Sequence, residues 1–135
     1  MKKLLSVNYS DWSFNLATLL LRIVFGGLML VNHGFVKMTK FSALQYKFAD
    51  PFHIGSRWSL VLVIFAEVFC SILLIIGLFS RLASIPLIIA MLIAFFIAHN
   101  GSTADGEQAA LFLAVFLTLL FVGPGKASVD GMIGK

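Results

Sequence analysis

The sequence contains very little charge. Only 12% of its residues are Asp, Glu, Lys or Arg, while 60% are hydrophobic. So few charged side chains cannot cover a soluble domain of 135 residues. The mean hydropathy of +1.01 points the same way. We therefore expect a membrane protein that has the lipid bilayer as its main surroundings.

Cysteine is almost absent as well. The one cysteine, Cys70, excludes an internal disulfide and a CxxC pair, and with them a thiol–disulfide relay within this chain. The basic residues are scattered, and no basic run interleaved with aromatic residues is present, which excludes nucleic acid as a partner. We also expect no nucleotide cofactor. The formal charge of +4 favours contact with anionic lipid headgroups.

The chain does contain long apolar runs. The stretch from Leu16 to His33 spans about 27 Å as a helix, close to the hydrocarbon thickness of a bilayer. The pattern predicts an all-α four-transmembrane-helix bundle, a single integral membrane domain over residues 1–135. Four crossings place both termini on one side, and Arg81 in the shortest loop with the Lys pair at the start favours the cytoplasm. The predicted helices cover residues 14–33, 58–78, 83–99 and 106–122.

The connection between the first two helices has its own pattern. Apolar and polar residues alternate at helical spacing over residues 39–50, which predicts an interfacial amphipathic helix in the headgroup plane. A loop packed on the mouth of the bundle is the equally weighted alternative. Gly34 is expected to end the first helix with Lys37 at the surface, and Asp105 is expected to cap the fourth.

Few polar groups lie within or at the ends of the predicted spans. His33 and His99 end two helices on the side away from the termini, and Glu107 begins the fourth helix there. Arg22 and Glu67 lie at similar depth, so they can pair across the first two helices. We predict a polar pocket lined by His33, Glu67, His99 and Glu107, with Arg22 as its floor. The fourth helix is expected to turn its small and polar stripe inward, namely Glu107, Ala110, Ala114 and Thr118.

Each of these residues also has an ordinary structural interpretation. An Arg22–Glu67 pair can serve only to fix the register of two helices. A glutamate at a helix start is favoured by the helix dipole, and a terminal histidine often bonds a carbonyl. The combination of all five favours a site over these separate explanations.

Such a pocket suits three kinds of chemistry. A histidine beside a carboxylate can exchange protons with a quinone, and an arginine can hold an anion. The candidate catalytic residues are Glu67, Glu107 and Arg22, and those for cofactor binding are His33, His99 and Arg22. His33, His99, Glu67 and Glu107 are a weak candidate set for a divalent metal, because their spacing matches no compact ligand motif. The pocket can also bind a small molecule without chemistry.

These residues occur in a pattern that resembles the DoxX family of small four-helix bacterial membrane proteins. The resemblance covers residues 16–131. It implies a location in the bacterial cytoplasmic (inner) membrane. It also implies kinship with the membrane subunit of thiosulfate:quinone oxidoreductase and with membrane complexes that handle thiol and oxidative stress. The matching residues are Arg22, Gly26, His33, Gly34, Lys37, Glu67, the segment 77–83, His99, Glu107 and the segment 123–130.

The leading interpretation is a membrane subunit of a redox system linked to quinone. Glu67 and Glu107 would relay protons, Arg22 would hold charge, and His33 and His99 would bind the head group or a metal. No side chain here carries electrons itself, so a soluble or membrane redox partner is required. A homo-oligomer is a further possible assembly. The alternative is a non-enzymatic membrane subunit that binds a small molecule or stabilises a partner protein.

Overall fold

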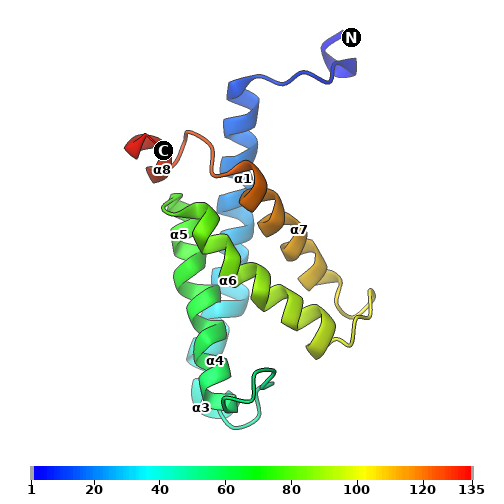
Figure 1. Cartoon of the computed structure of the whole chain (residues 1–135), viewed down its shortest axis with the longest axis vertical. Coiled ribbons are helices and arrows are strands. Elements are labelled where there is room, and N and C mark those ends of the chain that lie inside the picture. The colour runs from blue at the N-terminus through cyan, green and yellow to red at the C-terminus, as the bar shows by residue number, and fades with distance from the viewer. Residues whose placement is uncertain (1, 135) are drawn as a thin grey trace.

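The computed structural model describes residues 2–134, which form helices joined by turns. Met1 and Lys135, the two ends of the predicted domain, lie outside the described residues. Three long apolar helices and a shorter one form a bundle within the described residues, and Figure 1 shows both ends of the chain near the same end of the molecule. We call this the terminal end, and the opposite end, which carries the connection after the first helix, the loop end.

The first membrane helix, helix 1, is longer than predicted and runs without interruption from Asp11 to Thr39. Ser10 caps its start, where the side-chain oxygen accepts a hydrogen bond from the backbone amide of Ser13. Helix 1 consists of α1 (Asp11–Met29), the π-helical segment η2 (Leu30–Gly34) and α2 (Phe35–Thr39).

The predicted helix end at Gly34 is wrong, because the backbone of Gly34 is itself helical, with φ −63°. The glycine instead permits close helix contact. A Cβ at this position would lie 2.7 Å from the carbonyl carbon of Glu67. Helix 1 therefore continues past Gly34 and carries Lys37 along its next turn.

The other main helices agree with the predicted ranges to within a few residues at each end. Helix 2 and helix 3 are each apolar and long enough to cross a membrane, as is helix 1. The fourth helix, α7 (Glu107–Val122), has 16 residues and lies alongside helix 3 (Figure 1). Helix 2 comprises α4 (Ser56–Ile64), η3 (Phe65–Cys70) and α5 (Ser71–Ile76), and helix 3 comprises α6 (Ser80–Ile93) and η4 (Ala94–Ala98), where η3 and η4 are again π-helical.

The connections contain short helices only. The amphipathic helix predicted over residues 39–50 is limited to one turn, α3 (Phe41–Leu44), because the chain leaves the helical conformation at Lys40 and turns again after Gln45. The residues after α3 form a loop that packs at the loop end of the bundle, which agrees with the alternative prediction of a loop on the mouth of the bundle. The two other short elements are η1 (Lys2–Leu5) near the start and α8 (Val129–Ile133) near the end.

The inward face of α7 is opposite to the predicted one. Glu107, Ala114 and Thr118 are exposed, while the buried residues include Phe112 and Phe116. The aromatic side chains fill the centre of the bundle, where the ring of Phe112 meets the ring of Phe25 edge-on at 5.6 Å. Large apolar side chains therefore form the core, and the small polar stripe lies outside.

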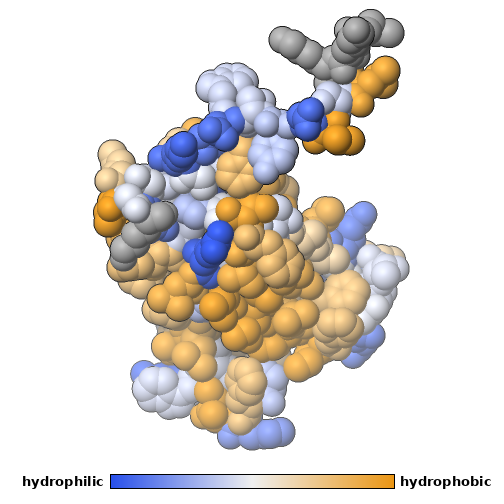
Figure 2. Space-filling view, turned by 45° about the horizontal axis from the view of Figure 1, so that its top comes forward, coloured by the Kyte–Doolittle hydropathy of each residue, from blue (hydrophilic) through white to orange (hydrophobic). Residues whose placement is uncertain are grey.

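The outer surface fits a bilayer. Figure 2 shows a continuous apolar area over the middle of the molecule, with hydrophilic residues gathered toward its ends. Many large hydrophobic side chains on the membrane helices are exposed, among them Leu20, Ile72 and Phe121. Such a surface is stable only against lipid or other apolar partners.

Candidate functional site

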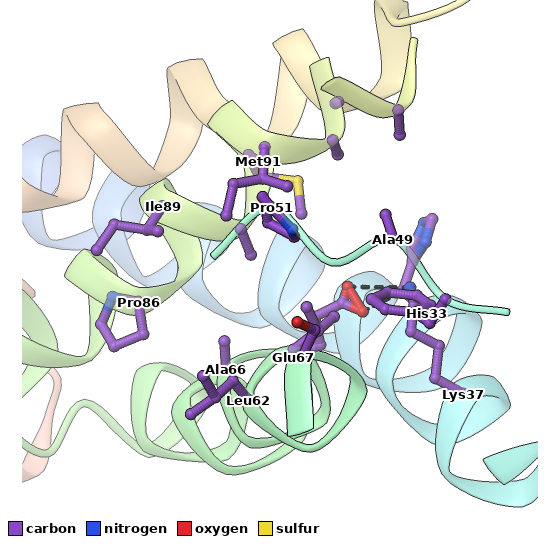
Figure 3. Close-up of a pocket in the computed structure, with 18 of the residues that line it drawn as sticks. His33, Lys37, Ala49, Pro51, Leu62, Ala66, Glu67, Pro86, Ile89 and Met91 are labelled. Atoms are coloured by element: carbon purple, nitrogen blue, oxygen red, sulfur yellow. Dashed lines mark hydrogen bonds and ion pairs between the residues drawn. The ribbon is translucent and has the colours of Figure 1, made fainter. Parts of the chain in front are cut away.

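A cavity of about 710 Å³ opens in the loop-end half of the bundle (Figure 3). Helices 1, 2 and 3, the start of α7 and the connection after α3 contribute to its walls. Most of its lining is apolar, which is typical of sites for small organic molecules. The polar and charged side chains that line it are His33, Lys37, Lys47, Ser59, Glu67, His99, Asp105 and Gln108.

An ion pair lies on this cavity. The ammonium nitrogen of Lys37 is 2.6 Å from one carboxylate oxygen of Glu67 and 3.1 Å from the other. The side chain of Glu67 is only 3% exposed, and that of Lys37 is 23% exposed. The close contact of Gly34 with the backbone of Glu67 brings the two helices near enough for this pair. The predicted partner of Glu67 was Arg22, so that pairing is wrong, and Lys37 does not lie free at the surface.

His33, inside helix 1, and His99, directly after helix 3, both line the cavity, as predicted. His33 lies one helical turn before Lys37 on helix 1, so both side chains share one face. The imidazole ring of His33 contacts the ring of Phe112 edge-on, at 5.5 Å between centroids. Figure 3 shows His33 and Lys37 at one end of the cavity, beside Glu67.

All three π-helical segments contribute to this cavity. His33 lies in η2, Glu67 lies in η3, and η4 ends directly before His99. A π-helical turn carries one extra residue and redirects the side chains that follow it, and such turns occur often at functional sites. Three π-helical segments therefore lie on one cavity, which makes this half of the bundle the candidate site.

The connection over residues 48–52 covers the loop end of the cavity with Phe48, Ala49, Pro51 and Phe52. Asp50 holds this segment in place. Its carboxylate accepts hydrogen bonds from the backbone amides of Ile54, at 3.0 Å, and Gly55, at 2.8 Å. It also accepts one from the Ser59 hydroxyl on helix 2, at 2.8 Å.

These hydrogen bonds change the acidity of Asp50. Partial loss of hydration raises the pKa of the carboxyl group, but the hydrogen bonds from Ser59, Gly55 and Ile54 and the nearby His53 act in the opposite direction. Their sum leaves the pKa of Asp50 below its ordinary value. The charged form of Asp50 is therefore the one that fastens the segment to helix 2.

Arg22 lies at the terminal end, away from this cavity. Arg22 is 1% exposed, and its guanidinium group donates four hydrogen bonds, all to backbone carbonyls. Two go to Leu74 and Ile75 at the C-terminal end of helix 2, where the carbonyls carry the negative end of the helix dipole. The other two go to Pro124 and Ala127 after α7. The predicted floor of the pocket is thus a link between helix 1, helix 2 and the C-terminal segment.

Asp130 completes this link. Its carboxylate accepts hydrogen bonds from the backbone amides of Phe79, at 2.9 Å, and Ser80, at 3.0 Å, where helix 3 begins. Its own backbone amide donates to the carbonyl of Gly77. The negative charge of Asp130 also offsets the charge of Arg22. We use the name terminal clamp for Arg22, Asp130 and the carbonyls and amides that they bind.

Glu107 does not line the cavity either. Its side chain is exposed on the outer face of α7, because Ala109 and Phe112 take the inward positions. Gly106, rather than Asp105, precedes the helix, and no side chain caps it. The predicted roles of Arg22 and Glu107 would require them to reach the cavity, and neither does.

The four residues predicted as metal ligands do not gather. Among residues 2–134, no group of three or more His, Cys, Asp or Glu side chains is close enough to hold a metal ion. Glu67 is engaged with Lys37 instead, and Glu107 points away from the cavity.

Two important residues escaped the sequence interpretation. The expected helix end at Gly34 leaves Lys37 outside the helix, although its four-residue spacing from His33 is a signal for a shared helix face. Asp130 has no assigned role of its own in the sequence pattern. Ser128 two positions before it is a common start of a short helix, and here its hydroxyl does accept from the amide of Gly131.

Comparison with known proteins agrees with the family pattern. The family model described as DoxX matches residues 17–100, which is more than half of the chain and includes Arg22, Lys37 and Glu67. A relative from Haemophilus influenzae, described as an uncharacterized protein, is 35% identical over 77 residues. That alignment covers 51% of this chain and 58% of the relative, so less than two thirds of the relative is matched. No solved structure matches.

Proposed function

This chain belongs to the DoxX family, and on that premise we propose that it is a membrane subunit of a redox system that holds a quinone head group in the loop-end cavity. The observation that carries the proposal is the buried ion pair of Lys37 and Glu67 at one end of an otherwise apolar cavity. A quinone has the matching form, because a flat conjugated ring with two carbonyl oxygens is attached to an apolar tail.

The size and lining of the cavity support a ligand of this class. About 710 Å³ falls within the usual range for sites that enclose small organic molecules. The ring of Phe112 and the apolar side chains of helices 2 and 3 suit the quinone ring, while Lys37 and His33 can donate hydrogen bonds to its carbonyl oxygens.

The ion pair also suits the proton transfers of quinone chemistry. Reduction of a quinone to a quinol takes up two electrons and two protons. The two electrons would come from a redox partner protein. Lys37 and His33 would each donate one proton to a quinone oxygen, and Glu67, after taking up a proton from water, would return it to Lys37. His99 lies on the same cavity, where it would supply a second imidazole for proton exchange.

The membrane arrangement completes the proposal. We infer that α7 is a fourth crossing, because it is apolar and runs alongside helix 3. The location is the bacterial cytoplasmic membrane, with both termini in the cytoplasm. The cavity then opens in the outer half of the bilayer.

A binding experiment tests this function. The protein is captured in lipid nanodiscs that contain a benzoquinone with a decyl tail, and the quinone that is retained is extracted and quantified against empty nanodiscs. We expect retention near one quinone per protein, a loss of about tenfold or more in affinity for Glu67→Gln, and no change for the matched control Glu107→Gln. Retention equal to that of empty nanodiscs would refute the proposal.

One observation favours a second function. Lys37 and Glu67 satisfy each other's charge, so the pair can simply hold helices 1 and 2 together around a passive ligand. A non-enzymatic subunit that binds a small molecule or stabilises a partner protein would retain quinone without changing its oxidation state. The two functions are separated by measuring the ratio of oxidised to reduced quinone by absorbance, with membranes as the electron source. A redox subunit would change this ratio, and a non-enzymatic subunit would not.

A further inference from the structure

The cavity reaches the outer surface between helix 2 and helix 3. Leu62 on helix 2 and Ile89 on helix 3 both line the cavity, yet their side chains are 51% and 46% exposed. Side chains that line the cavity and are also exposed between two helices mark a rim of the cavity on the side of the bundle. We call this opening, formed by Leu62, Phe65, Pro86 and Ile89, the lateral opening.

The lateral opening lies at the depth of the hydrocarbon. Ile89 is at the middle of helix 3, which runs from Ser80 to Ala98. Phe65 lies next to the middle of helix 2, which runs from Ser56 to Ile76. Figure 3 shows Pro86 and Ile89, with Leu62 across from them, at the end of the cavity opposite His33 and Lys37. The polar end of the cavity, at His33 and Lys37, is thus opposite to the lateral opening.

The loop end of the cavity is lined by the connection after α3. Phe48, Pro51 and Phe52 belong to this connection, and Asp50 fastens it to Ser59 on helix 2. The lining at this end includes the charged side chains of Lys47 and Asp105, whereas the lateral opening is formed by apolar side chains alone, which suit an apolar tail.

We propose that the cavity takes its ligand sideways from the membrane and binds it with the apolar tail protruding through the lateral opening into the lipid, while the head group rests against Lys37 and Glu67. This inference rests on the proposed function and narrows it. The ligand is an amphiphile that has one compact head group and a single narrow hydrocarbon tail. A hydrocarbon tail gains little free energy when it moves from lipid to protein, because both surroundings are apolar. The lateral opening therefore selects ligands by shape. A larger side chain placed in the opening should exclude ligands that have a tail.

A variant that fills the lateral opening tests the inference. Ile89→Trp places a larger side chain in the opening, and Leu62→Trp does so from the opposite wall. Leu92→Trp is the matched control, because Leu92 is 39% exposed on the same helix but does not line the cavity. Each variant, with the wild type, is tested in nanodiscs for retention of the benzoquinone with a decyl tail and of the same benzoquinone without the tail. Circular dichroism and size-exclusion elution verify that each variant is folded.

We expect Ile89→Trp and Leu62→Trp to weaken retention of the tailed quinone by about tenfold or more, and Leu92→Trp to leave it unchanged. The tailless quinone should bind all four proteins alike. Equal retention of the tailed quinone by every protein would overturn the lateral route and leave the proposed function intact. Equal weakening of both quinones by Ile89→Trp would also overturn it, since the substitution would then disturb the head-group site. Failure of the wild type to retain either quinone would overturn both the proposed function and this inference.

Discussion

The two halves of the bundle each bury a cation from helix 1, but they satisfy it in opposite ways. At the terminal end, Arg22 donates four hydrogen bonds to backbone carbonyls that cannot change their charge. At the loop end, Lys37 contacts a single carboxylate, that of Glu67, on the wall of a cavity. A saturated cation holds structure, whereas a cation with one titratable partner beside a cavity is available to a ligand. The terminal clamp is therefore assigned to stability and the loop-end cavity to function.

The largest effect is expected at the terminal clamp. Arg22→Met would leave four backbone carbonyls without their donor and Asp130 without its countercharge. We expect the free energy of unfolding to fall by about 3–5 kcal/mol, measured by denaturant unfolding in detergent. The exposed Arg81 supplies the control, Arg81→Met, which should change little. Arg22→Met protein that is as stable as the wild type but fails to bind quinone would reverse the assignment of the two halves.

The next effect is expected when one member of the loop-end pair is neutralised. Glu67→Gln would leave the ammonium group of Lys37 without a countercharge near the hydrocarbon. Because Lys37 remains partly exposed, we expect a loss of about 2 kcal/mol in unfolding free energy, less than for Arg22→Met. Thermal unfolding of Glu67→Gln and of the control Glu107→Gln measures it. A larger loss than that of Arg22→Met would show that the loop end is the main structural contact.

A smaller effect concerns the helix contact that supports the pair. In Gly34→Ala, the new Cβ would lie 2.7 Å from the backbone of Glu67, so helix 1 must move away from helix 2. We expect a loss of about 1–3 kcal/mol in unfolding free energy and weaker quinone retention. Gly27→Ala is the matched control, because a Cβ there meets nothing within 4 Å, and it should be neutral or slightly stabilising. Unchanged quinone retention in Gly34→Ala would show that the spacing of the pair is unimportant.

The smallest effect is expected at Asp50, and it depends on pH. Since the pKa of Asp50 is lowered in the folded protein, its stabilising contribution is complete above the ordinary aspartate pKa and is lost as the pH falls through the lowered value. We expect Asp50→Asn to be slightly less stable than the wild type near neutral pH, with the difference vanishing in strong acid. Hydrogen exchange of residues 48–52 as a function of pH measures it. A difference that grows toward acid would contradict this sign.

The helices could be predicted from the sequence because lipid imposes a simple requirement of length and apolarity. The helix ends were less certain, since a glycine after a helical run can either end the helix or admit a neighbour. At Gly34 the contact with Glu67 decided the outcome, and that contact depends on tertiary packing. The π-helical segments leave no signal in an apolar pattern, so the irregular turns on the cavity could not be predicted.

The site was predicted in part. Depth along the helices brought His33, Glu67 and His99 to one cavity, as the structure shows. Depth does not give the direction in which a side chain points, so Arg22 and Glu107 were misplaced. The acceptors of Arg22 are backbone carbonyls, which every residue has, and no sequence pattern distinguishes the ones that the fold brings within reach of a guanidinium group.

Removing both charges of the loop-end ion pair at once separates a role in ligand binding from a role in stability. In the double variant Lys37→Met with Glu67→Gln, neither charge of the pair remains, and neutral replacement of a buried ion pair often restores stability. We expect its free energy of unfolding to lie within about 1 kcal/mol of the wild type and its quinone retention in nanodiscs to be lost. If the double variant retained quinone as the wild type does, the loop-end pair would not serve a ligand.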